Sequence, residues 1–336
     1  MDSLGLGDLA SSGLRVRQTA ALKRLLARHA EEVTTRTVAD PVRHRGGNMW
    51  PLADVEGAIT RITSWTRNGD ILRSRLSAIE TALDTITTVA ERSGASMIGA
   101  GELGSDAQVT VVATESRGVL ETMISTLNLR LGDRTLLAGW ASDGPALADA
   151  DSMLDAMKGA IAASGAVGLR DIVDAVDAWF ADPDGFGTYG YLGGPSSEGG
   201  VPVAEGEVMA TPLTAADPAL VETLRAVALG ALVDAGVGSG NPVLRAGLVA
   251  EGGRALIEGA RGRVAVAAEI GAARMRLDLI MQRNSAEGDA LQAARLSMLE
   301  VDPLVAASAL TETETQLQAL YAITARLSRL SFVNQF

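Results

Sequence analysis

The sequence predicts a mainly α-helical protein whose N- and C-terminal helices pair antiparallel as a long coiled-coil rod, with a mostly helical middle lobe inserted between them. Three observations predict this. Hydrophobic residues make up 47% of the 336 residues but aromatic residues only 3%, which favours helices packed through small and aliphatic side chains. Apolar residues recur at three- and four-residue steps near both ends. One long segment rich in glycine, proline and serine, residues 183–206, falls in the middle of the chain and predicts a small β or loop segment there.

The N-terminal part predicts two helices. The first presents one apolar face, made of Leu22, Leu25, Leu26, His29 and Val33. Asp40-Pro41 and the following glycine pair end it, because the residue before proline resists helix. A longer, coiled-coil-like helix is expected over residues 52–89, with a kink at Asn68-Gly69.

The middle lobe contains three amphipathic stretches, residues 150–164, 169–182 and 217–233. Asp217-Pro218 predicts an N-cap followed by a first-turn proline. The scarce aromatic residues Trp140, Trp179 and Phe180 are expected in the core of this lobe.

The C-terminal part predicts a second long helix from about Ile270, a break at Asp302-Pro303, and a last helix. The apolar stripe of the last helix consists of Leu310, Leu317, Leu320, Leu327 and Leu330, followed by Phe332. Neither terminal stripe is wide enough for a buried core helix, so each needs a partner. The predicted domains are an N-terminal assembly helix and turn, two rod segments flanking the middle lobe, and a C-terminal assembly helix: 1–45, 46–135, 136–240, 241–301 and 302–336.

Composition excludes several kinds of function. The 41 acidic and 29 basic residues give a net charge of −12, which argues against nucleic-acid binding. The absence of cysteine excludes disulfides, thiolate metal sites and thiol nucleophiles. The first residues lack the basic region and the apolar run of a secretory signal peptide, so we expect none, and no apolar run is long enough to predict a membrane-spanning helix.

No motif predicts catalysis, a cofactor or a metal. The string GAGELG, residues 99–104, matches a dinucleotide-binding pattern, but a helix precedes it instead of a strand, so we expect a turn between helices. DPDG, residues 182–185, lacks the glutamate of a calcium loop and predicts a turn. His29 and His44 lie apart from clustered carboxylates and are expected to be structural or solvated.

Three segments carry a family resemblance. The last 25 residues, ETETQLQALYAITARLSRLSFVNQF, resemble the C-terminal helix of bacterial flagellins and of the related hook–filament junction proteins. LNLRLGDRTLLAGWASDGPAL, residues 127–147, is similar to the segment that follows the family's N-terminal rod helices. TTRTVADPVRHRGG, residues 34–47, is similar to the turn joining its first two helices, with Thr35 in place of the usual glycine. SSGLRV, residues 11–16, copies a flagellin-like string but is expected before the first helix, so we treat it as coincidence.

The resemblance implies a structural component of the bacterial flagellum, outside the cell, that leaves through the flagellar secretion channel without a cleaved signal. Its partners would be further copies and neighbouring axial proteins, namely another junction protein and flagellin, with an export chaperone beforehand. The Asp-Pro turn and the LLAGW segment favour the hook–filament junction protein; a flagellin that forms the filament is the alternative, and an unrelated enzyme or helical binding module stays open. The implied assembly interface consists of Leu22, Leu25, Leu26, Val33, Leu310, Leu317, Leu320, Leu327, Leu330 and Phe332.

Overall fold

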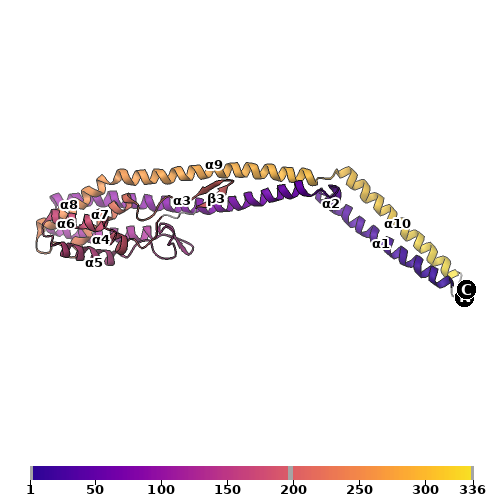
Figure 1. The fold of residues 1–336 in the computed structure, drawn as a ribbon, viewed down its shortest axis with the longest axis horizontal. Helices are drawn as coiled ribbons and strands as arrows, with labels where there is room; N and C mark the ends of the chain where they lie inside the picture. Colours follow the sequence, from indigo (N-terminus) through magenta and orange to yellow (C-terminus); the bar gives the residue numbers. More distant parts are fainter. Residues whose placement is uncertain (1–2, 196–199, 334–336) are drawn as a thin grey trace. The chain divides into compact units, whose positions relative to one another are not determined.

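The computed structural model describes residues 3–195 and 200–333, and the side chains of 13–195 and 200–327 (Figure 1). The chain forms two compact units. The terminal unit consists of Met1–Thr63 and Ser285–Phe336, and the middle unit of Ser64–Asn284. The middle unit has 17 basic and 28 acidic residues, a net charge of −11, whereas the terminal unit has 12 and 13, a net charge of −1. Nearly all of the acidic excess therefore belongs to the middle unit.

The described chain is mainly α-helical, as predicted. Its α-helices are α1 Ser3–Thr35, α2 Pro41–His44, α3 Trp50–Leu103, α4 Asp106–Leu127, α5 Ala150–Ser164, α6 Leu169–Ala181, α7 Pro218–Asp234, α8 Pro242–Glu258, α9 Ala260–Leu299 and α10 Pro303–Val333. A π-helical turn, η1 Phe186–Gly190, and two short antiparallel hairpins complete it, β1 Arg130–Leu131 with β2 Arg134–Thr135, and β3 Val201–Ala204 with β4 Glu207–Met209. None of the helices in the described ranges has the length and apolarity that a membrane crossing requires.

In the terminal unit, α1 and α10 pack as an antiparallel pair (Figure 1). Hydrogen bonds at their joint fix the direction: the Val38 N–H donates to the Leu299 carbonyl at 2.8 Å, and the Val301 N–H donates to the Arg36 carbonyl at 3.1 Å. These bonds tie the end of α1 to the start of α10. The predicted break before α10 is confirmed, because Asp302 accepts the Leu304 N–H at 2.8 Å while Pro303 occupies the first turn.

The two longest helices, α3 and α9, also run antiparallel. In the terminal unit Arg295 pairs with Glu56 at 3.2 Å, and in the middle unit Arg73 pairs with Asp278 at 2.9 Å. Both helices contribute buried side chains to the core of the middle unit: Leu72, Leu76, Ile79, Leu83 and Ile86 from α3, and Val266, Ile270, Leu277, Ile280 and Met281 from α9.

The central helix of the middle unit is α7, which packs on α4, α6 and α8. Its N-cap Asp217 accepts the Ala219 N–H at 2.9 Å, and Pro218 fills the first turn, as the sequence predicts. Periodicity does not reveal α8, whose glycines allow a close approach. A Cβ at Gly252 would lie only 2.4 Å from the carbonyl oxygen of Ala226 in α7.

The aromatic residues divide between core and surface. Trp179 and Phe180 are buried as predicted, with ring centroids 4.9 Å apart in an edge-to-face arrangement. Trp140 is 66% exposed, so its predicted place in the core is wrong. Its backbone N–H donates to the Pro195 carbonyl at 3.2 Å, and its indole covers Gly194, where a Cβ would lie 2.2 Å from the ring nitrogen. The indole therefore rests on a glycine backbone at the surface.

Several glycines that predicted breaks lie inside continuous helix. α3 runs through Gly69, Gly99 and Gly101, so there is no interruption at Asn68-Gly69, and only Gly104 of GAGELG lies in the connection between α3 and α4. A Cβ at Gly69 would lie 2.1 Å from the sulfur of Met281, and one at Gly101 would lie 2.6 Å from the Ala246 carbonyl oxygen. At these two positions glycine permits close helix packing. The string SSGLRV lies within α1, and not before the first helix.

Candidate assembly surface

The predicted interface residues of α1 and α10 line the contact between these two helices. Leu317 is buried, at 9% exposure. Half-buried beside it are Leu22, Leu25, Leu26, Val33, Leu310 and Leu320. Together with buried Ala306 and Thr313, the α10 positions repeat at four and three residues, which is the spacing of a coiled-coil seam. The two terminal stripes therefore cover each other within one chain.

Other apolar side chains of α1 and α10 are exposed. Leu327, the remaining predicted residue with a described side chain, continues the seam spacing seven residues after Leu320 and is 43% exposed. Sequence periodicity missed the others, which are exposed on α1 and α10: Leu14, Val16, Leu304, Val305, Tyr321 and Ile323. Ile323 and Leu327 are one helical turn apart, and that i, i+4 spacing could have revealed them. Leu330 and Phe332 have side chains outside the described residues.

The turn after α1 is held by both side chains and backbone. Arg36 has a φ of 58°, in the left-handed region that usually requires glycine. Glu32 accepts the Ala39 N–H at 3.3 Å and contacts the His29 ring nitrogen Nδ1 at 2.9 Å, which gives His29 the structural role that we expected. Asp40 caps α2 by accepting the Arg43 N–H at 3.1 Å. The turn at residues 34–47 is therefore held by specific hydrogen bonds, and its strained residue is Arg36.

α1 carries basic residues without ion-pair partners. None of these five forms an ion pair with a described carboxylate: Arg15 and Arg28, which are half-buried, and Arg17, Lys23 and Arg24, which are exposed. Charged groups that lack partners within the chain are available to a neighbouring surface, where complementary charge improves orientation more than affinity.

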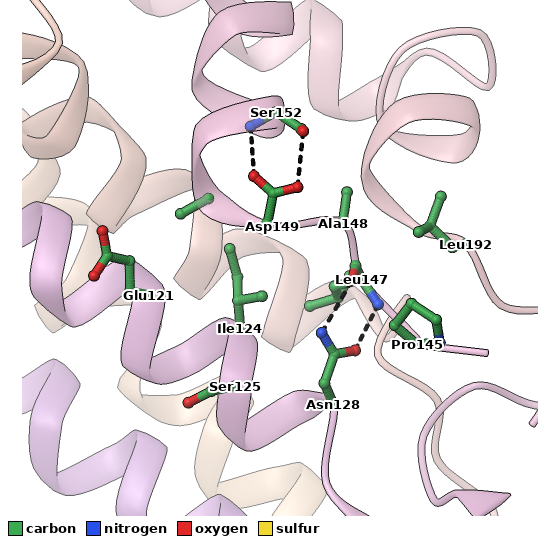
Figure 2. Close-up of a pocket in the computed structure, with 11 residues that line it drawn as sticks. Glu121, Ile124, Ser125, Asn128, Pro145, Leu147, Ala148, Asp149, Ser152 and Leu192 are labelled. Carbon is green, nitrogen blue, oxygen red and sulfur yellow. Dashed lines mark hydrogen bonds between the residues drawn. The ribbon is translucent and has the colours of Figure 1, made fainter.

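A hollow of about 730 Å³ in the middle unit is lined by side chains that stabilise the local structure (Figure 2). Asn128 pairs with the backbone of Leu147, donating from Nδ2 at 3.0 Å and accepting the Leu147 N–H at 2.8 Å. Asp149 caps α5 by accepting the N–H and the hydroxyl of Ser152, and these hydrogen bonds lower the pKa of its carboxyl. The other ionisable lining residue is Glu121. The polar groups here stabilise the loop, and they form no nucleophile–base pair.

The residues that could suggest a metal or calcium site have structural roles instead. Nowhere in the described ranges do three His, Cys, Asp or Glu side chains converge as metal ligands would. In DPDG, Asp182 accepts the Asp184 N–H at 2.9 Å, which confirms the predicted turn.

Comparison with known proteins supports the resemblance. Residues 256–335 match the model of the bacterial flagellin C-terminal helical region, and this range includes the whole of α9 and α10. No curated protein matches the sequence. Among solved structures, the fold is similar to that of a "putative flagellar hook-associated protein" from Vibrio parahaemolyticus, with a TM-score of 0.50 and 18% sequence identity over 73% of this chain and 94% of the other. Residues 256–335 are therefore similar to the C-terminal helical region of bacterial flagellins, and the fold of the chain is similar to that of the Vibrio protein.

Proposed function

We propose that the protein is a structural subunit of the bacterial flagellum and that it forms the junction between hook and filament. The observation that carries this proposal is the flagellin match over residues 256–335, because that region contains α10 and its outward apolar side chains. The name of the similar Vibrio structure, a hook-associated protein, favours the junction over the filament. The proposal places the protein in the flagellum, where copies of itself, flagellin and another junction protein are its neighbours.

The surface that we assign to assembly is the outer side of the α1–α10 pair. Tyr321 and Ile323 expose apolar area that water solvates at a cost of about 25 cal/mol per Å². Contact with a neighbouring copy removes that cost. The inward residues, such as Leu317 and Leu320, would support the same interface indirectly by holding α1 and α10 together. Before assembly, an export chaperone would cover this surface, and the chain would leave through the flagellar secretion channel.

The first test is a deletion strain. We expect hooks without attached filaments, with flagellin released into the medium, and restoration by the intact gene. Immunogold labelling should place the protein in a short zone at the end of the hook. Normal filaments in the deletion strain would refute the junction role.

The second test compares two single variants of α10. Ile323→Asp places a carboxylate at an exposed apolar position of the assigned surface, whereas Ala322→Asp places one at an exposed position about 100° away around the helix. Both purified proteins should unfold close to the wild-type midpoint, since both side chains are exposed. Only the first variant should fail to enter the flagellum, because a carboxylate buried at the contact costs several kcal/mol. Equal incorporation of both variants would exclude this face as the interface.

A flagellin that forms the filament itself remains the second candidate, and the family model favours it, since the matched region is that of flagellins. Immunogold labelling separates the two functions. Labelling along the whole filament would establish the filament subunit, and labelling confined to its base would establish the junction protein.

A further inference from the structure

The helix α9 is apolar on two opposite sides. Its inner side supplies buried Ile270, Leu277 and Ile280 to the core of the middle unit. Its outer side exposes Val264 at 62%, Met275 at 67% and Leu279 at 68%. Exposed Ala268 and Ala272 lie between them at helical spacing. We call Val264, Ala268, Ala272, Met275 and Leu279 the α9 ridge.

The α9 ridge is unusual for a surface helix face. Its steps of four, four, three and four residues place all five members on one stripe, which extends over about 22 Å at 1.5 Å per residue. A helix in contact with water on its outer side normally carries charged and polar residues there. An uninterrupted apolar stripe of this length indicates a contact with another protein surface.

The same unit contains a groove of complementary shape. It lies between α3 and α4, has a volume of about 430 Å³, and is lined almost entirely by small residues and two valines: Ala95, Ser96, Gly99, Ala100, Ala107, Gln108, Val111 and Val112. A Cβ at Gly99 would meet nothing within 4 Å, and Val111 is 59% exposed, so the groove is open. We call it the α3–α4 groove. Small lining residues leave room for large side chains such as those of Met275 and Leu279.

The charges beside ridge and groove are complementary. Arg261, Arg276 and Arg283, with Glu269, stand within one turn of ridge residues. Beside the groove, the sequence places three acidic residues and one basic residue: Glu91, Glu102, Glu115 and Arg92.

Some of these charges already have partners within the chain. Glu207 pairs with Arg283 at 2.5 Å, and Arg254 pairs with Glu102 at 3.5 Å. Neither Arg261 nor Glu115 forms an ion pair among the described side chains. A basic border facing an acidic border selects the register of a contact, even though each exposed pair contributes little free energy.

We propose that the α9 ridge of one copy binds in the α3–α4 groove of the next copy. The two surfaces consist of different residues, so the contact is heterologous: each bound copy still offers an unused ridge or groove, and the contact can propagate into a ring or a helix. This inference rests on the proposed function, to which it adds a contact between middle units that is separate from the α1–α10 surface.

Site-specific disulfides test the contact directly, because the chain has no cysteine of its own. Met275→Cys is introduced into an affinity-tagged copy and Val111→Cys into an untagged copy. The matched control replaces Val111→Cys by Thr122→Cys, which is also exposed on α4 but lies eleven residues further along. Mild oxidation is applied to mixtures of the purified proteins and to flagella isolated from cells that express both copies.

We expect a tagged–untagged disulfide dimer from the 275–111 mixture, with at least tenfold less from the 275–122 mixture, since a disulfide requires Cα atoms about 4.4–6.8 Å apart. If flagella contain both copies but the 275–111 dimer is absent or no more abundant than the control, the inference is overturned and the flagellar function stands. If the purified proteins form the dimer but neither enters the flagellum, the contact stands and the proposed function is overturned. Failure of both refutes both.

Discussion

Replacing Gly101 by alanine should destabilise the middle unit, although alanine is the better helix former. A Cβ at this position of α3 would lie 2.6 Å from the Ala246 carbonyl oxygen and 2.7 Å from the backbone nitrogen of Ala250 in α8. Glycine-to-alanine replacement within a helix gains about 1 kcal/mol, and overpacking costs about 1–3 kcal/mol. Because the obstacle is backbone that cannot rotate away, the larger cost applies. The net loss for Gly101→Ala is then about 2 kcal/mol.

Gly99→Ala is the matched control, two residues earlier on the same helix. A Cβ there meets nothing within 4 Å, so only the helix-propensity gain of about 0.5–1 kcal/mol remains. The two substitutions should therefore have opposite signs and differ by about 3 kcal/mol.

Thermal unfolding followed by circular dichroism, supported by urea titration, measures both variants. For a unit of this size a loss of 2 kcal/mol lowers the midpoint by about 4–8 °C. If Gly101→Ala unfolds at or above the wild-type midpoint, α8 does not approach α3 as closely as the structure has it. The explanation of this glycine would then fail.

Three further predictions concern single side chains. Arg36→Gly should stabilise the terminal unit by about 1 kcal/mol, because glycine adopts the left-handed φ of 58° without strain, whereas Arg36→Ala should not stabilise it. Hydrogen exchange at the Val38 and Val301 amides would measure the difference, and equal protection in both variants would contradict the prediction. Trp179→Ala should cost about 3–5 kcal/mol and Trp140→Ala less than about 1 kcal/mol by chemical unfolding, so equal losses would place Trp140 in the core. The pKa of Asp149 is lowered in the folded state, so its carboxylate stabilises the fold above its ordinary value of 3.8, and that contribution is lost as the pH falls through the lower folded value. The difference in midpoint between wild type and Asp149→Asn should be largest at neutral pH and should close in acid; a constant difference would exclude the carboxylate as its cause.

The sequence predicts the helices that have local start and stop signals. Asp217-Pro218 and Asp302-Pro303 mark the starts of α7 and α10, because an acidic cap and a first-turn proline act within a few residues. Glycine residues do not predict helix ends as reliably. Gly69 and Gly101 suggest breaks by propensity, yet they lie in α3 because other helices approach them there, and that contact depends on residues far away in the sequence.

The assembly surface was only partly predictable for a related reason. Periodicity identifies that Leu310, Leu317 and Leu320 share a stripe, but it does not tell whether the stripe faces α1 or a neighbouring copy. In the structure the stripe faces α1, which leaves Tyr321 and Ile323 outside. Sequence periodicity also fails for a helix with two apolar sides, because the inner and outer apolar residues of α9 together do not form a single stripe.

Because the negative charge is concentrated in the middle unit, the ionic strength should control how the protein polymerises. Middle units that carry −11 each repel when they approach side by side, over a Debye length of about 30 Å in 0.01 M salt but about 10 Å in 0.1 M. The terminal unit, with −1, has no comparable barrier. In dilute buffer, copies should therefore meet first through their terminal helices, and close packing of their middle units should follow only when counterions accumulate between them. Polymer formed by dialysis into salt would then depend on the order of these two steps, so slow and rapid changes of salt should give products of different length.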